Sequence, residues 1–277
     1  MRGRYKEVAT ICQNKYIDLD IIPEFRQAKG NRRKKHKPTS NAQKIYNERK
    51  RGKEVTQLIN HNFKENDIFT TLTYDNAHLP RDERAAKKQA ANFIRRVRRF
   101  CIKNNLPELK YIICTERTER TGRLHHHIII NGSGLLFESI NKLWGKGNIN
   151  DIKPLHFDEQ NGVEGLAHYF LKQPLNGNAY TCSRNLKQPE RETHTGRLTR
   201  KELRYMARFG DVSPLRRLYP EREYNIVDYR VIYNEVNGYY YFAVKLLLKY
   251  KQKKEKQSAA RHRGRAAKHN SGERLRI

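Results

Sequence analysis

The chain has 277 residues and a net charge of +29, with 58 Lys and Arg against 29 Asp and Glu. Its four scattered cysteines form no CxxC pair, which argues against a disulfide framework and a zinc ribbon. We find no apolar run of membrane-spanning length and no signal-peptide pattern, so we expect a soluble cytoplasmic protein. A chain this basic binds polyanions, of which nucleic acid is the obvious one.

Residues 1–66 predict a basic extension that contains a helix. Tyr16–Ile22 could form a strand that ends at Pro23. The basic run Arg32–Lys37 is typical of a solvated loop. From Ser40 to Asn60 the pattern turns helical, with Ser40 able to act as the N-cap.

A strand and a long helix follow. Asp67–Tyr74 is β-branched and aromatic, which favours a strand. Between Arg81 and Asn104, apolar residues recur at steps of three and four and predict an amphipathic helix. Its apolar stripe consists of Ala86, Ala90, Phe93, Ile94, Val97 and Cys101. Basic residues crowd the remaining surface, which is either solvated or lies along a phosphate backbone; among them are Arg95, Arg96, Arg98 and Arg99.

A β-hairpin comes next, formed by Leu109–Glu116, a polar turn and the histidine strand Arg123–Ile130. The elements expected after it are a helix at Ser139–Trp144, a strand at Asn148–Ile152 and a helix at Val163–Gln173. Residues 67–175 thus predict the order β-α-β-β-α-β-α. This is an α/β chain of the α+β type, with an antiparallel sheet flanked by helices.

Residues 176–248 predict a basic C-terminal region. We expect a polar loop over 175–200, a helix at Lys201–Phe209, and a hairpin with Asn237-Gly238 at its turn. The hairpin strands are Tyr229–Val236 and Tyr239–Leu247. Residues 249–277 hold eleven Lys and Arg against two Glu, so we expect a disordered tail that follows nucleic acid. The sequence contains no P-loop motif.

The three consecutive histidines carry the first chemical signal. Side chains alternate along a strand, so His125 and His127 share one face while His126 points into the core. The hairpin brings Glu116 beside His125, which would give two imidazoles and one carboxylate for a metal ion. Glu119 is a competing carboxylate at the tip of the turn. The alternative for each histidine is an ordinary hydrogen-bonded strand residue.

The helix at Val163–Gln173 carries the second signal. Its apolar residues form one face, and Tyr169 and Lys172 fall outside that face as neighbours three positions apart. A tyrosine held away from the core, beside a lysine, is available to react or to bind. Exposed Tyr and Lys are common on helices, so this signal is weak by itself.

The combination of patterns is more specific than any part. Phe69–Tyr74, His125–His127 and Tyr169–Lys172 occur in this order, and together they resemble the HUH endonuclease superfamily. More narrowly, they resemble the rolling-circle replication initiators of small plasmids and single-stranded DNA phages. The middle position of the histidine motif, hydrophobic in the family, is His126 here. The single tyrosine suggests the single-tyrosine branch, and the resemblance covers Asp67 to Pro174.

The resemblance implies an RRM-like (ferredoxin-like) nicking domain and a divalent Mg²⁺ or Mn²⁺ ion held by Glu116, His125 and His127. It implies that Tyr169 attacks the scissile phosphate, leaving a 5′-phosphotyrosine and a free 3′-OH, and that the strand is later rejoined. Lys172 would supply positive charge near the tyrosine. No ATP is needed, which agrees with the missing P-loop.

The expected partners are single-stranded DNA at a replication origin, a host DNA polymerase and a helicase. The basic helix arginines and Arg123 are the candidate DNA contacts. One alternative is a non-catalytic basic nucleic-acid-binding protein, in which Tyr169 stacks on a base. Others are a single-tyrosine transposase, usually shorter, and a relaxase, in which Tyr5 or Tyr16 would be the nucleophile. The sequence leaves open whether a phage, a plasmid or an integrated element encodes the chain.

Overall fold

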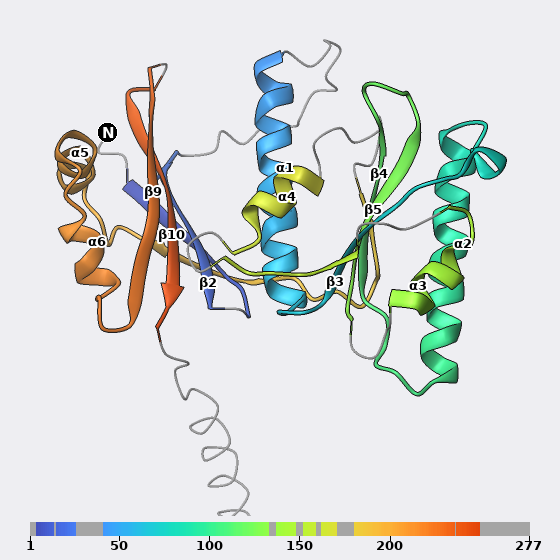
Figure 1. Ribbon diagram of the computed structural model, residues 1–277. Coiled ribbons are helices and arrows are strands. Elements are labelled where there is room, and N and C mark those ends of the chain that lie inside the picture. Colours follow the sequence, from blue (N-terminus) through green and yellow to red (C-terminus); the bar gives the residue numbers. More distant parts are fainter. Residues whose placement is uncertain are drawn as a thin grey trace, which may run out of the picture.

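The computed structural model describes residues 4–13, 15–25, 41–132, 137–147, 152–158, 162–170, 180–235 and 237–249. Two five-stranded antiparallel sheets lie on either side of helix α1 (Figure 1). The strands are β1 Arg4–Ile11, β2 Tyr16–Glu24, β3 Ile68–Leu72, β4 Tyr111–Arg117, β5 Leu124–Ile130, β6 Ile152–Pro154, β7 Thr181–Cys182, β8 Glu190–Thr195, β9 Tyr224–Asn234 and β10 Tyr239–Leu248. The α-helices are α1 Asn41–Asn62, α2 Glu83–Lys103, α3 Phe137–Trp144, α4 Glu164–Phe170, α5 Arg200–Phe209 and α6 Ser213–Leu218.

The first sheet, here the histidine sheet, has the strand order β6-β3-β5-β4-β7. Its elements follow one another as β3, α2, β4, β5, α3, β6 and α4, which confirms the predicted β-α-β-β-α-β-α order. The predicted α+β class, an antiparallel sheet flanked by helices, is likewise confirmed and is consistent with an RRM-like arrangement.

Helices α2 and α3 cover one face of the histidine sheet (Figure 1). The Asp82 carboxylate caps α2 by accepting a hydrogen bond of 2.6 Å from the amide of Ala85. All six residues of the predicted apolar stripe of this helix are buried. They pack with Trp144 of α3 against the strand residues Ile128 and Ile130. Burial of this face holds α2 flat on the sheet and leaves its basic side outward.

Helices α1 and α4 cover the opposite face of the histidine sheet. Ile59 and Phe63 of α1 and Phe170 of α4 pack against Phe69 and Ile129 of the sheet. Apolar residues therefore fill the space beneath both helices, and α4 is placed on the strands that carry the histidines.

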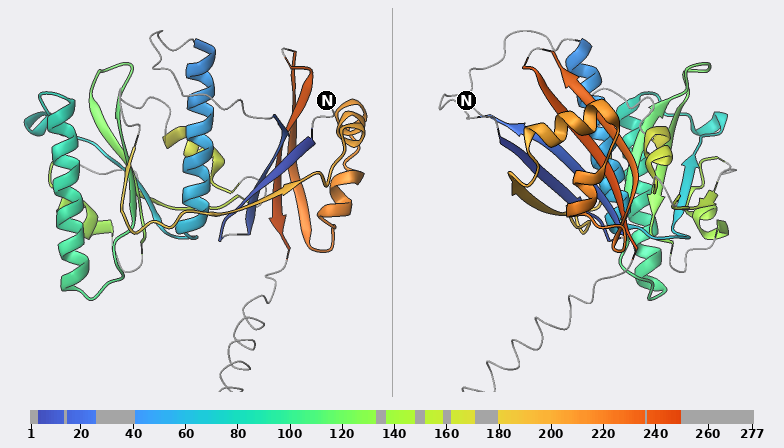
Figure 2. Two further views of the ribbon diagram at one scale, coloured as in Figure 1. Left: turned by 180° about the vertical axis from the view of Figure 1, so that it is seen from behind. Right: turned by 90° about the vertical axis from the view of Figure 1, so that its left-hand side faces the viewer.

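The second sheet has the order β8-β1-β2-β10-β9. Helices α5 and α6 pack on the face that lies away from α1, as Figures 1 and 2 both show. The predicted hairpin is confirmed as β9 and β10, and the predicted helix at Lys201–Phe209 as α5. Strand β2 continues one residue past Pro23, because Pro23 lies opposite Tyr5 near the end of the pairing.

The structure corrects the expected loop over 175–200, because β7 and β8 lie within it. Five of the six residues of β8 are exposed, so it shows no apolar alternation, and its pairing with β1 defines it as a strand. The basic run Arg32–Lys37 and residues 250–277 lie outside the described residues. In the described part of the chain, every helix is too short or too polar to cross a membrane.

Polar side chains join the second sheet to the helices between the sheets. Gln57 of α1 donates to the Asp18 carboxylate at 2.7 Å, and Lys53 pairs with Asp20 at 2.7 Å. Lys245 of β10 forms an ion pair with Glu164, the first residue of α4. The second sheet thereby contacts both helices that cover the histidines.

Candidate metal centre

The register of the histidine hairpin brings three metal-ligating side chains together. Backbone pairing places Glu116 of β4 opposite His125 of β5, and these side chains share a face with His127. The two Nε2 atoms lie 3.2 Å apart. Glu116 Oε2 lies 3.8 Å from His125 Nε2 and 3.4 Å from His127 Nε2. The three residues thus converge on one point, as the sequence predicted.

Two threonine hydroxyls orient the imidazoles. Thr71 Oγ1 lies 3.0 Å from His127 Nδ1, and Thr118 Oγ1 lies 3.3 Å from His125 Nδ1. A proton on each Nδ1, donated to the hydroxyl, leaves the Nε2 lone pair facing Glu116. Hydroxyl or carbonyl partners of this kind fix the tautomer of metal-ligating histidines. The sequence analysis missed both threonines, although Thr71 lies within the first motif.

Burial sets the charge state of the group. Desolvation, reinforced by the neighbouring His127, lowers the pKa of His125, so its imidazole is neutral at neutral pH. Burial also raises the pKa of the Cys114 thiol, which stays protonated and lies 3.8 Å from Glu116 Oε1. A neutral imidazole is the form of histidine that binds a metal ion.

The donor set fits a divalent metal ion. Ligand atoms bound to one ion at about 2.1 Å lie roughly 3 Å or more apart, and the separations found here are 3.2 to 3.8 Å. Two imidazoles and one carboxylate leave coordination positions open for substrate oxygens. Glu116, His125 and His127 therefore form a group that can hold a metal ion.

His126 faces the other side of the sheet. Its Nε2 lies 2.6 Å from the Tyr74 hydroxyl and its Nδ1 lies 2.9 Å from Thr115 Oγ1. The side chain is fully buried beside Trp144, and desolvation lowers its pKa to about 3. The prediction that His126 is a core residue is confirmed.

Tyr169 lies beside the metal-ligating group. Its ring centroid is 5.0 Å from that of His127 and 6.2 Å from that of Phe69. Tyr169 is 51% exposed, whereas its neighbour Phe170 is buried beneath α4. The helix thus holds the tyrosine away from the core and next to a candidate ligand. Lys172 lies outside the described residues.

The predicted DNA-contact arginines are in a different place. Arg95, Arg98 and Arg99 line a surface hollow of about 380 Å³ on α2, which covers the sheet face opposite the metal-ligating group. Arg96 also reaches this hollow, but it donates to the carbonyl oxygens of Leu143 and Trp144 at the end of α3. The α2 arginines are therefore separated from the metal-ligating group by the sheet.

Arg123 has a local structural role as well. Its guanidinium donates to the Tyr74 carbonyl at 2.7 Å and to the Asn76 side chain at 3.0 Å. These contacts join the start of β5 to the loop after β3. Arg123 therefore braces the end of the sheet where Thr71 and His125 lie.

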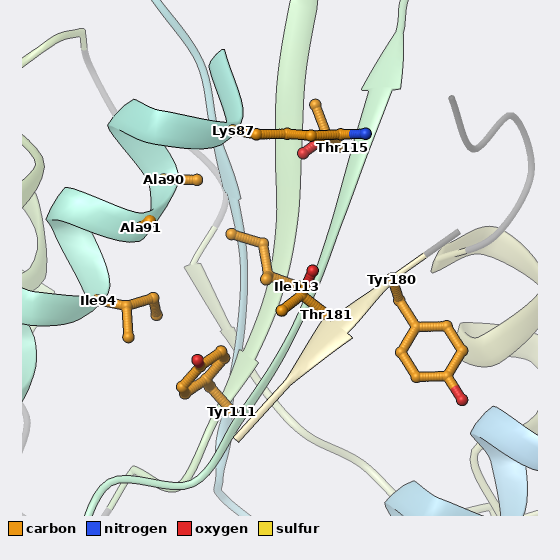
Figure 3. A pocket seen from close by; sticks show the side chains of 9 residues that line it. All are labelled: Lys87, Ala90, Ala91, Ile94, Tyr111, Ile113, Thr115, Tyr180 and Thr181. Atoms are coloured by element: carbon orange, nitrogen blue, oxygen red, sulfur yellow. The ribbon is translucent and has the colours of Figure 1, made fainter. Parts of the chain in front are cut away.

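A small cavity of about 120 Å³ lies on the α2 face of the histidine sheet. Figure 3 shows Lys87 of α2 near Thr115 of β4, with Tyr111 and Tyr180 at the lower end. Thr115 precedes Glu116 in β4 and points to the opposite face. The cavity is therefore separate from the metal-ligating group.

The fold and the site together define an α+β protein that carries a buried Glu-His-His group, able to hold a metal ion, beside an exposed tyrosine. Residues 67–174 match the family model of the replication-associated protein ORF2. This match supports a replication initiator family for a segment that is less than half of the chain. A search of curated proteins finds no match.

Proposed function

We propose that this protein is a rolling-circle replication initiator, an HUH endonuclease of the single-tyrosine type, that nicks and rejoins single-stranded origin DNA. The observation that carries the proposal is the position of Tyr169, whose ring lies 5.0 Å from the ring of His127. The family match over residues 67–174 supports a role in replication.

In this proposal Glu116, His125 and His127 hold a divalent ion, Mg²⁺ or Mn²⁺. When bound, the ion polarises a non-bridging oxygen of the scissile phosphate and stabilises the charge that builds at phosphorus. Thr71 and Thr118 keep both Nε2 atoms directed at the ion through their bonds to Nδ1. Phe69 packs against the His127 ring and restricts its rotation.

Tyr169 provides the nucleophile. Its hydroxyl oxygen forms a bond to phosphorus as the bond to the 3′ oxygen breaks, and the 3′ oxygen takes up a proton. The products are a 5′-phosphotyrosine and a free 3′-OH. Attack of a 3′-OH on the phosphotyrosine reverses the step and rejoins the strand without ATP. A tyrosine ordinarily ionises near pH ~10, so positive charge from Lys172 would favour the phenolate.

The free 3′-OH primes synthesis by a host DNA polymerase, while a host helicase unwinds the duplex. The outward basic side of α2, with Arg95, Arg98 and Arg99, is proposed to hold DNA phosphates. Arg123 would contribute from the end of the sheet near the metal-ligating group.

The relaxase alternative loses support from the second sheet. Its nucleophile would be Tyr5 or Tyr16, and both are buried. Tyr16 lies 3.3 Å from the Asp18 carboxylate, which together with desolvation raises its pKa. Neither residue lies beside a metal-ligating group in the described part of the chain.

A Tyr169→Phe variant tests the proposal. Incubated with single-stranded origin oligonucleotides and Mn²⁺, the wild type should cut and form a covalent adduct visible on a denaturing gel. The variant should bind the same DNA in a gel shift but form neither product. Undiminished nicking would refute the assignment of Tyr169. A wild type that binds but never cuts, with or without Mn²⁺, would favour the non-catalytic DNA-binding alternative.

A further inference from the structure

Helix α5 has an outer side that the second sheet does not use. The helix packs on the face of the sheet that lies away from α1, burying Leu203 and Met206 (Figures 1 and 2). Its exposed residues recur at steps of three and four and so share one face. This face, here the α5 face, consists of Lys201, Arg204, Tyr205, Arg208 and Phe209.

The helix is held firmly without help from that face. Thr199 and Glu202 form a reciprocal capping box at its start. At its end Gly210 adopts a left-handed conformation, with φ of 70°, and its carbonyl accepts a bond of 3.0 Å from the Tyr229 hydroxyl. Both ends and the buried side are therefore fixed, so folding leaves the composition of the α5 face free.

Two large aromatic rings project from the α5 face. Phe209 is 62% exposed and Tyr205 is 46% exposed, with ring centroids 5.0 Å apart. The Arg208 guanidinium lies 5.3 Å from the Phe209 centroid. Contiguous exposed apolar groups on a soluble protein mark a binding surface. Aromatic rings interleaved with arginines suit unpaired bases and their phosphates.

The charge of the α5 face selects the partner. The acidic residue within the helix, Glu202, is engaged by the cap and by Arg217 at 2.8 Å. Asp211, beyond the helix end, bonds to Ser213. A second copy of this chain, or its own tail with eleven basic residues against two acidic ones, would bring positive charge to positive charge. A polyanion with exposed planar groups is the complementary partner.

We infer that the α5 face binds single-stranded DNA, by contacts of Arg204 and Arg208 to phosphates and of Tyr205 and Phe209 to bases. The inference rests on the proposed function only for the identity of the strand. The face lies on the far side of the second sheet from α4, which carries Tyr169. It is thus a second DNA contact, remote from the bond that is cut.

The double variant Arg204→Gln/Arg208→Gln tests the phosphate contacts. Affinity of the full chain for a fluorescent single-stranded oligonucleotide is measured at several salt concentrations. The slope of log affinity against log salt should fall by about 0.7 per lost contact, or about 1.4 for the pair. The control Arg222→Gln/Arg230→Gln removes the same charge from arginines already paired with Glu223 and Asp228. Equal slopes for variant and control would overturn the inference.

The double variant Tyr205→Leu/Phe209→Leu tests stacking. Leucines keep the apolar contact between neighbouring helix turns, so a purely structural role predicts unchanged DNA affinity. The inference predicts at least about a fivefold loss on single-stranded DNA and little loss on duplex. Unchanged affinity, an equal loss on duplex, or a loss confined to single-stranded RNA would each overturn it.

Failure of this inference is distinguishable from failure of the proposed function. Both double variants should still cut a short oligonucleotide that spans only the cleavage site, at the wild-type rate. A wild type that does not cut removes the proposed chemistry, while the affinity and salt measurements still decide the α5 face.

Discussion

The Thr71 hydroxyl lies 3.0 Å from Nδ1 of His127. The two residues come from different motifs, and the pairing of β3 with β5 places them opposite each other. The first strand motif therefore supports the histidine motif by a side-chain bond, in addition to its place in the sheet.

Replacing Thr71 by valine should weaken metal binding. Valine keeps the shape of the side chain but removes the partner of His127 Nδ1, so the imidazole loses its preferred tautomer. Loss of such a partner typically lowers metal affinity by about 10- to 100-fold. Titration of Mn²⁺ by calorimetry measures the change. Thr193→Val, on the exposed strand β8, is the matched control and should bind Mn²⁺ like the wild type.

Replacing Tyr74 by phenylalanine should destabilise the fold and spare the metal-ligating group. The change leaves Nε2 of the fully buried His126 without its hydroxyl partner, at a cost of about 1–3 kcal/mol. Chemical unfolding measures the free energy, and Mn²⁺ titration measures the metal affinity. A large loss of Mn²⁺ affinity would contradict the assignment of His126 to the opposite face. The exposed Tyr233 offers Tyr233→Phe as a neutral control.

The pH dependence of stability should identify the buried carboxyl of Asp18. Burial raises its pKa above the ordinary 3.8, so the folded state holds this proton more tightly than the unfolded chain. Its contribution to stability is full below the ordinary pKa and is lost as pH rises through the raised value. Asp18→Asn should therefore gain stability relative to the wild type as pH rises from about 4, and the gain should then level off.

Asp211 supplies a comparison of opposite sign. Hydrogen bonds from Ser213 lower the pKa of its carboxyl, so its contribution is present above the ordinary pKa and lost as pH falls. Asp211→Asn should thus lose stability relative to the wild type at neutral pH. Melting temperatures followed by circular dichroism between pH 4 and 8 give both differences. A difference for Asp18→Asn that does not vary with pH would contradict its raised pKa.

The sequence predicted the elements whose side chains show strong periodicity. The stripe of α2 and the alternation of β5 each match the buried residues, because burial of one face imposes the spacing. Strand β8 escaped notice because its stability comes from pairing with β1, which lies far away in the sequence. Thr71 and Thr118 were missed for a similar reason, since their role depends on partners 56 and 7 residues away.

The metal-ligating residues were predictable because the hairpin makes them neighbours. Glu116 and His125 lie directly across two adjacent strands, a relationship that the turn length alone determines. The position of Tyr169 beside His127 was less accessible. It depends on how α4 packs against Phe69 and on the apolar residues beneath it, which no local pattern specifies.

The packing of α1 sets a lower limit on any fragment that keeps the site. Residues 67–174, the span of the family match, exclude α1 and with it the buried side chains of Val55, Ile59 and Phe63. Cutting the chain there would open the sheet face beneath α4 to water and remove the support on which the tyrosine helix rests. A nicking unit isolated for biochemistry should therefore begin before Asn41.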